Sequence, residues 1–270
     1  MNWARIMVPL SGGEADAAMV AAGAEIAAAF KAQLACIHAP ADVADLMPWM
    51  GEGFMGGVQV TAIESLKEAA QEGERSVRGM VEACPYGAKT VVSLHSPVWA
   101  GLAMESRLSD VVVFDDQAAR GKGPLAEAFQ QIVADEQRPT IVARPGLKAG
   151  GVVAVAWDGG KEATRAARTA LPLLEIASRV VILSAPAATS RNFDPAGLQA
   201  FFAARGVKAD LEVMPEGGDA GPLLLKASKA AGADLLVAGA FGHPRLQEFI
   251  FGGTTRTLLQ ADGPSLFLSH

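Results

Sequence analysis

The feature that most restricts the fold of this chain is an internal repeat. The segment Arg5–Ala39, RIMVPLSGGEADAAMVAAGAEIAAAFKAQLACIHA, resembles Val152–Ala185, VVAVAWDGGKEATRAARTALPLLEIASRVVILSA. Each segment holds a short apolar run, a turn with two glycines, an Ala-rich stretch with helical periodicity and a second apolar run. We therefore interpret each segment as the strand–helix–strand opening of an α/β unit, used twice in one chain.

The ends of the two halves also correspond. Ser109–Gly146 matches Ala233–His270, because each contains an apolar run, a helical stretch and a last strand preceded by proline. A chance likeness between two α/β domains is the alternative, and the matched order, the Gly-Gly turn and the two prolines argue against it. We predict domains at residues 1–146 and 151–270, joined by the linker Pro145–Gly151.

Alternation of strands with helices predicts an α/β fold with two tandem doubly wound domains, each a mostly parallel sheet with helices on both faces. In the second half we expect strands near residues 152–157, 180–184, 209–214, 234–239 and 265–269. We expect helices near residues 160–177, 194–205, 219–231 and 254–261. Right-handed crossovers then bring the ends of the first and fourth strands to the carboxyl edge of the sheet, where such folds bind ligands.

Composition excludes several classes of function. Half of the residues are hydrophobic, yet no apolar run approaches the roughly 18 residues of a membrane span, and the N-terminus lacks the pattern of a signal peptide. The net charge of −6 argues against binding to nucleic acid, which needs a basic surface. Cys36 and Cys84 lack partners at metal or redox spacing and are expected to be reduced thiols. We therefore expect a cytoplasmic protein with no membrane or nucleic-acid partner.

The segment GAFGHPRLQEFIFGGTTRTLL, Gly239–Leu259, is the strongest candidate for a binding loop. Gly239 and Gly242 follow the fourth strand of the second half, and Gly252, Gly253, Thr254 and Thr255 open the next helix. Glycine allows a ligand to approach the backbone closely, and the N–H groups at a helix start favour an anion. A phosphate group is the natural candidate.

The spacing G-x2-G-x9-G-G-T-T is neither the dinucleotide nor the Walker motif. It resembles the G-x2-G-x9-G-[ST] loop of the universal stress protein family, and the resemblance extends over the whole chain as a tandem of two family domains. The resemblance implies five-stranded sheets of order 3-2-1-4-5 and a site for ATP or a related nucleotide. Asp158 would lie near the adenosine moiety, while Gly239, Gly242 and Gly252 would face the phosphates.

The resemblance leaves the phosphate count of the ligand open. The family's Ser or Thr falls on Gly253 here, and Thr254 comes one residue later. ATP, ADP and AMP therefore all remain candidates, with Mg²⁺ accompanying a triphosphate, and no protein metal site is assigned. Arg245 either binds a phosphate through two hydrogen bonds or pairs with Glu248. His243 either donates a hydrogen bond to phosphate or caps the strand end.

The first half departs from the family pattern. Ser11 stands where the second half has Asp158, and Asp115 and Asp116 stand where it has Gly239 and Ala240. Two carboxylates near a phosphate would repel it by about 1 kcal/mol or more each at short range. A solvated acidic loop explains the same residues. In either case we expect that the first half has lost nucleotide binding.

One long connection in the first half, residues 39–66, mixes bulky apolar side chains with glycines. Its Met47, Trp49, Met50, Phe54 and Met55 suit a lid or a partner groove, or simply pack back onto the domain. His95 and Trp99, near the end of the third strand, could line a second pocket with this segment.

The function expected is that of a tandem universal stress protein whose second domain binds an adenine nucleotide as a regulatory signal in a stress response. No catalytic residue is assigned, and any ATP hydrolysis is expected to be slow. An enzyme on the same scaffold is one alternative, with Asp158 and either Glu216 or Asp219 as base or metal ligand. An interaction module that binds no nucleotide is another alternative.

The final strands bear on assembly. The resemblance implies pairing through the last strands, which is common among domains of this family, so the two halves are expected to pair within one chain. Association of two chains into a homodimer stays open.

Overall fold

The computed structural model describes residues 2–42, 56–184, 194–214, 219–240 and 253–270. Strands and helices alternate along the chain, as the repeat predicts. The elements of the N-terminal half are β1 (Arg5–Leu10), α1 (Asp16–Phe30), β2 (Gln33–His38), α2 (Gly56–Ala83), β3 (Lys89–Ser93), α3 (Val98–Arg107), β4 (Val111–Asp115), α4 (Asp116–Ala119), α5 (Ala126–Ala134) and β5 (Thr140–Ala143).

The C-terminal half repeats this succession. Its elements are β6 (Val152–Trp157), α6 (Lys161–Thr169), α7 (Leu171–Ile176), β7 (Arg179–Ser184), α8 (Ala196–Ala203), β8 (Ala209–Val213), α9 (Ala220–Ala230), β9 (Leu235–Gly239), α10 (Gly253–Gln260) and β10 (Ser265–Ser269).

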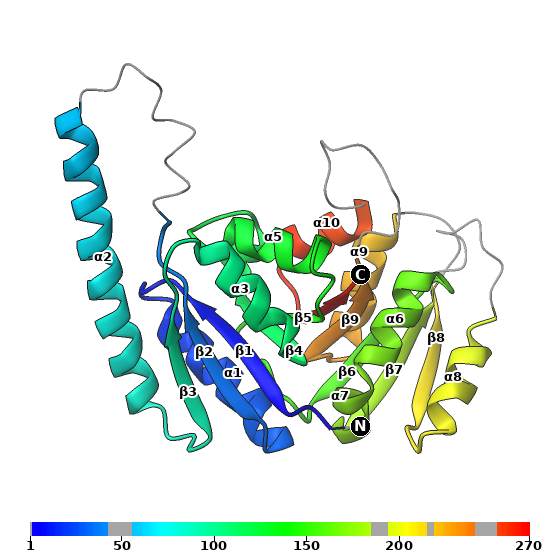
Figure 1. Cartoon of the computed structure of the whole chain (residues 1–270). Coiled ribbons are helices and arrows are strands. Elements are labelled where there is room, and N and C mark those ends of the chain that lie inside the picture. Colours follow the sequence, from blue (N-terminus) through cyan, green and yellow to red (C-terminus); the bar gives the residue numbers. More distant parts are fainter. Residues whose placement is uncertain (1, 43–55, 185–193, 215–218, 241–252) are drawn as a thin grey trace.

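All of these strands belong to one ten-stranded sheet of order β3-β2-β1-β4-β5-β10-β9-β6-β7-β8. Within each half the order is 3-2-1-4-5 and the pairing is parallel, which confirms the predicted fold class. The two sheets are not separate, because β5 and β10 pair antiparallel in the middle, with Phe267 opposite Ile141 (Figure 1). The expected pairing of the final strands is thus present within one chain.

Each face of the sheet carries its own layer of helices. One buried cluster joins the sheet to α1, α2, α6, α7 and α8, and a second cluster joins the other face to α3, α4, α5, α9 and α10. The central strands are therefore buried on both sides, which explains why they are continuous apolar runs rather than alternating ones. The outer strand β8 is half exposed, and its Val213 lies 56% exposed.

The two halves share a hydrogen-bonded detail as well as a topology. In the first half, the backbone N–H groups of Ala4 and Arg5 donate to Asp110 Oδ2 at 2.6 and 2.9 Å. In the second half, the N–H of Val152 donates to Asp234 Oδ2 at 2.8 Å. Each aspartate stands just before the fourth strand of its half and ties that strand to the start of the first. This equivalence supports the interpretation of the two halves as repeats.

Two predicted boundaries were wrong. The helix expected over residues 160–177 is two helices that meet at Ala170, because Pro172 has no N–H to continue the hydrogen-bond pattern. The connection expected over residues 39–66 ends earlier, because α2 already begins at Gly56 and runs along the β3 side of the sheet (Figure 1). The bulky residues Met47 to Met55 of that connection lie outside the described residues.

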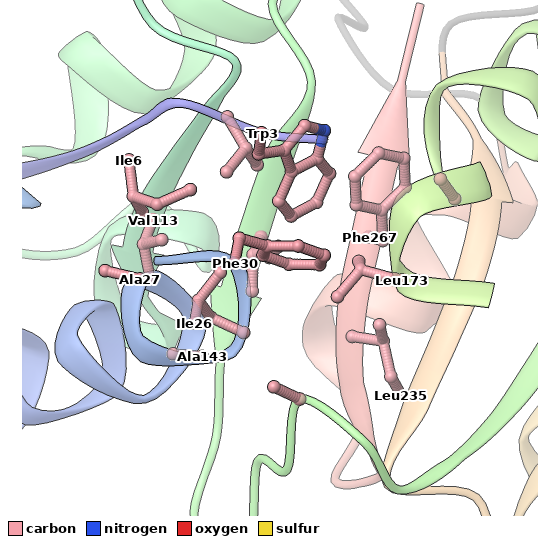
Figure 2. Packing of buried hydrophobic residues seen from close by; sticks show 14 of the residues in the cluster. Trp3, Ile6, Ile26, Ala27, Phe30, Val113, Ala143, Leu173, Leu235 and Phe267 are labelled. Carbon is pink, nitrogen blue, oxygen red and sulfur yellow. The ribbon is translucent and has the colours of Figure 1, made fainter. Parts of the chain in front are cut away.

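Aromatic side chains fill the junction between the halves. Trp3, just before β1, packs against Phe30 at a ring-centroid distance of 4.9 Å and stacks on Phe267 of β10 at 6.2 Å (Figure 2). Leu173 and Leu235 continue the same cluster into the C-terminal half. The core on this face therefore passes without interruption from one half to the other.

Among the described residues, no helix is both long enough and apolar enough to span a membrane.

Truncation of Phe267 tests whether this junction stabilises the whole chain. Phe267 is fully buried, so Phe267→Ala removes contacts to both halves and should lower the free energy of unfolding by ~3–5 kcal/mol. Urea denaturation measures the change. Val213→Ala on the exposed edge strand is the control and should stay within about 0.5 kcal/mol of wild type. A loss at Phe267 no larger than at Val213 would contradict a shared core.

Candidate functional site

The carboxyl edge of the C-terminal half brings the predicted site residues together. β6 and β9 are neighbouring parallel strands, so Asp158 after β6 and Gly239 at the end of β9 emerge at the same edge. β10 lies on the other side of β9, and α10 precedes it. The order of the strands thus places the first turn, the fourth strand end and the start of α10 on one side of the sheet.

The turn after β6 is organised by Asp158. Its Oδ1 accepts a hydrogen bond from the N–H of Gly160 at 2.8 Å, a turn that brings the chain from the strand into α6. Gly159 in between has a φ of +70°, a conformation that glycine adopts without strain. The Asp158 side chain nevertheless lies on the surface, where its carboxylate can reach a ligand.

Gly239 has a packing role that its sequence motif did not indicate. A Cβ built on Gly239 would lie 2.6 Å from the backbone nitrogen of Ala163 and 2.7 Å from the carbonyl carbon of Glu162. These atoms belong to the first turn of α6, so the absence of a side chain lets α6 pack directly on the end of β9. Gly239 therefore sets the distance between the helix and the strand at this edge.

The start of α10 has the properties of an anion site. Gly253 is exposed, and no described residue lies within 4 Å of a Cβ built on it. Thr254 is half-buried, and Thr255 is buried with Leu258 and Leu259. The first N–H groups of an α-helix have no partner within the helix, and its dipole favours negative charge there. No acidic side chain occupies the first turn of α10. The remaining predicted residues of the loop, Gly242, His243, Arg245 and Gly252, lie outside the described residues.

The corresponding turn of the N-terminal half is filled by a carboxylate of the protein itself. Asp16, in the first turn of α1, is buried and accepts hydrogen bonds from the N–H groups of Gly12 at 2.7 Å and Ser11 at 3.3 Å. Burial raises the pKa of Asp16 even though these two N–H groups act in the opposite direction. The amides that follow β1 thus bind an internal anion.

Asp115 and Asp116 are also used by the protein, so the interpretation of this segment as a solvated acidic loop was incomplete. Asp115 caps α4, since its Oδ1 accepts from the N–H of Ala118 at 2.6 Å. Asp116 forms ion pairs with Arg120 and with the buried Arg144, both at 2.6 Å. The expected loss of nucleotide binding in this half stays a prediction, and the structure adds that its acidic pair has structural partners.

A buried histidine lies close to the same edge. His38, at the end of β2, is 1% exposed, and its Nδ1 lies 2.9 Å from Ser93 Oγ. Its Nε2 is buried, has no hydrogen-bond partner among the described residues and faces Gly73, where an added Cβ would lie 2.8 Å away. Burial lowers the pKa of His38, and the nearby His95 lowers it further. The carboxylates of Glu74 and Asp16 act in the opposite direction but do not outweigh burial. The imidazole is therefore held neutral beneath α2.

Sequence reasoning missed Asp16, His38 and Arg144 as important polar groups. For Arg144 a signal existed, because an arginine directly after the apolar strand TIVA needs an anionic partner if the strand is buried. Nothing in the spacing of Asp16 or His38 distinguishes them from surface residues. Their roles depend on the packing of α1 and α2, which the pattern of one sequence does not define.

Metal binding and thiol chemistry have little support in the described residues. In the parts of the chain that the structure places, no cluster of three or more His, Cys, Asp or Glu side chains could hold a metal ion. Cys36 and Cys84 are buried free thiols. Burial raises the pKa of Cys36 to about 12, so this thiol stays protonated and unreactive at neutral pH.

The comparisons with known proteins agree with the fold. Residues 179–261 match the sequence profile of the universal stress protein family. This segment contains β7, β9 and α10, and so most of the site described above. A segment of the C-terminal half therefore matches the universal stress protein family, which is the family that the loop spacing indicated. Among curated proteins, no relative matches this sequence significantly.

Solved structures extend the likeness of fold to the whole chain. A universal stress protein from Archaeoglobus fulgidus DSM 4304 has a TM-score of 0.65 at 13% identity, with 98% of this chain and 95% of that chain covered. The cytoplasmic domain of a prokaryotic cation chloride cotransporter has a TM-score of 0.51 at 15% identity, with 98% and 95% covered. At these identities the likeness shows the fold, and it covers both halves in tandem.

The buried His38 predicts a pH dependence of stability. Its folded-state pKa is lowered, so on acidification the unfolded chain binds the proton first and the folded state loses stability. Between about pH 7 and about pH 5, wild type should therefore lose more stability than His38→Gln, which cannot titrate. Urea denaturation at several pH values measures both proteins. Equal losses over this interval would contradict the neutral, buried state of His38.

Proposed function

We propose that the C-terminal half binds an adenine nucleotide at the carboxyl edge of β6 and β9, with its phosphates at the start of α10. One observation carries the proposal: the exposed Gly253 opens a helix whose first turn holds no acidic side chain, at the strand edge where Asp158 and Gly239 also emerge. The position of this helix start within the family match supports a nucleotide as the anion.

The other residues of the site receive roles within this proposal. Asp158 accepts hydrogen bonds from ribose hydroxyls or from nearby donors. The loop residues Gly242, His243, Arg245 and Gly252 approach the phosphates, and Thr254 contributes a hydroxyl at the helix start. ATP, ADP and AMP are the candidate ligands, with Mg²⁺ accompanying the triphosphate.

The bound nucleotide serves as a regulatory signal in a cytoplasmic protein of the stress response. A dedicated enzyme on the same scaffold is the alternative, and one of its candidate bases also has a structural role. Asp219 caps α9, with its Oδ1 accepting from the N–H of Gly221 at 3.1 Å. We therefore propose binding with at most slow hydrolysis.

A charge placed at Gly253 tests the site directly. Gly253→Glu introduces a carboxylate at an exposed position where no described residue lies within 4 Å of the added Cβ, so the fold should tolerate it. An acidic residue in the first turn of a helix is itself favourable. The same carboxylate repels phosphate, so the affinity for ATP or ADP with Mg²⁺ should fall by about tenfold or more. Calorimetric titration, after removal of any nucleotide that copurifies, measures the dissociation constant.

Gly79→Glu is the matched control. Gly79 lies on the exposed side of α2 in the other half and also has open space, so this variant adds the same charge to the protein. Its affinity should equal that of wild type. Absence of nucleotide binding by wild type, or equal affinities for all three proteins, would contradict the proposed site.

A further inference from the structure

A buried arginine joins the two halves at the end of α10, the helix whose start belongs to the proposed site. Arg144 directly follows β5, and its side chain is only 4% exposed. Its Nε donates to Asp116 Oδ1 of its own half at 2.6 Å. Its Nη1 donates to the carbonyl of Pro264 at 3.0 Å, and its Nη2 to the carbonyls of Leu258 and Leu259 at 3.0 and 3.2 Å. The guanidinium thus binds the C-terminal half through three backbone carbonyls.

Arg120 makes a second connection of the same kind. Its Nε donates to the other oxygen of Asp116, Oδ2, at 2.6 Å. Its Nη1 donates to the carbonyl of Gln260 at 2.9 Å, and its Nη2 to Asp262 Oδ1 at 2.7 Å. Asp116 therefore holds both arginines, one on each carboxylate oxygen, and both arginines reach across to the same end of α10.

The carbonyls of residues 258–260 are in the last turn of α10, where carbonyl groups have no partner within the helix. α10 has no basic residue of its own in that turn. The cations that complement the negative end of its dipole therefore come from the N-terminal half. An eight-residue helix is marginal without such contacts, so its direction depends on what holds its ends.

The opposite end of α10 is the start of the helix at Gly253. With a rise of about 1.5 Å per residue, this start lies roughly 10 Å from the carbonyls that the arginines hold. A tilt or rotation of the last turn of α10 therefore changes the direction of the N–H groups in its first turn. The proposed phosphate contacts depend on those groups.

We propose that Asp116, Arg120 and Arg144 are positioning residues, through which the N-terminal half sets the nucleotide affinity of the C-terminal half. The inference rests on the proposed function. It also gives a role to Asp116, which stands where the second half has Ala240. In this role the carboxylate of Asp116 orients the helix of the other half through the two arginines.

The test compares two carboxylates that each bind an arginine. Asp116→Asn removes the charge that holds Arg120 and Arg144 while keeping the shape of the side chain. Glu136→Gln is the matched control, because Glu136 binds Arg107 through two hydrogen bonds of 2.6 Å and both residues lie in the N-terminal half. Arg120→Gln is the milder second variant, since Arg120 is more exposed than Arg144.

Calorimetric titration with ATP and Mg²⁺ should show at least about fivefold weaker binding for Asp116→Asn and for Arg120→Gln, and wild-type affinity for Glu136→Gln. The double variant Asp116→Asn/Gly253→Glu should lose less affinity than the product of the two single losses, because both changes act on the start of α10. A general loss of stability would instead act independently of Gly253.

The outcomes separate the two proposals. Wild type that binds no nucleotide overturns the proposed function and this inference with it. Wild-type binding that Asp116→Asn and Arg120→Gln leave unchanged, or that Glu136→Gln weakens equally, overturns the inference alone. Additive losses in the double variant also overturn it, because the effect of Asp116 would then not pass through α10.

Discussion

The antiparallel pairing of β5 with β10 joins two five-stranded sheets, and most other features of the molecule depend on it. It converts two inner edge strands into the centre of one sheet, so that neither presents unpaired backbone groups. The pairing also brings Phe267 to Trp3 and extends the core across both halves. Because Arg144 follows β5 directly, the same pairing places its guanidinium at the end of α10.

The two halves use one scaffold for different purposes. In the N-terminal half, the amides after β1 bind the carboxylate of Asp16, and Asp116 holds two arginines. In the C-terminal half, Asp158 after β6 is exposed, β9 ends in Gly239 where the first half has Asp115, and the start of α10 has no acidic side chain in its first turn. In the first half, carboxylates of the protein itself thus occupy the positions near the strand ends. In the second half, the proposed site leaves the start of α10 for the phosphates of a ligand.

The sequence was sufficient to predict the repeat and the α/β class, because apolar runs and glycine turns recur in matched order in both halves. The strand order within each half was implied by the resemblance of the loop to the universal stress protein family. The sequence was also sufficient to place Asp158, Gly239 and Gly253 at one edge, since parallel strands end on the same side. It was not sufficient for Asp16, His38 or Arg144, whose roles come from contacts between elements far apart in the chain. The break between α6 and α7 at Pro172 follows from a local signal, the missing N–H of proline, whereas the start of α2 at Gly56 lies within a stretch whose glycines favour a loop.

A crystal structure of the protein with ATP and Mg²⁺ would test the central claim most directly, namely that one fold carries one nucleotide site rather than two. We predict a single nucleotide per chain, with phosphate oxygens at the first N–H groups of α10 and the ribose beside Asp158. We predict no nucleotide at the turn after β1, where Asp16 already occupies the amides. A nucleotide in the N-terminal half, or density away from the start of α10, would contradict this assignment.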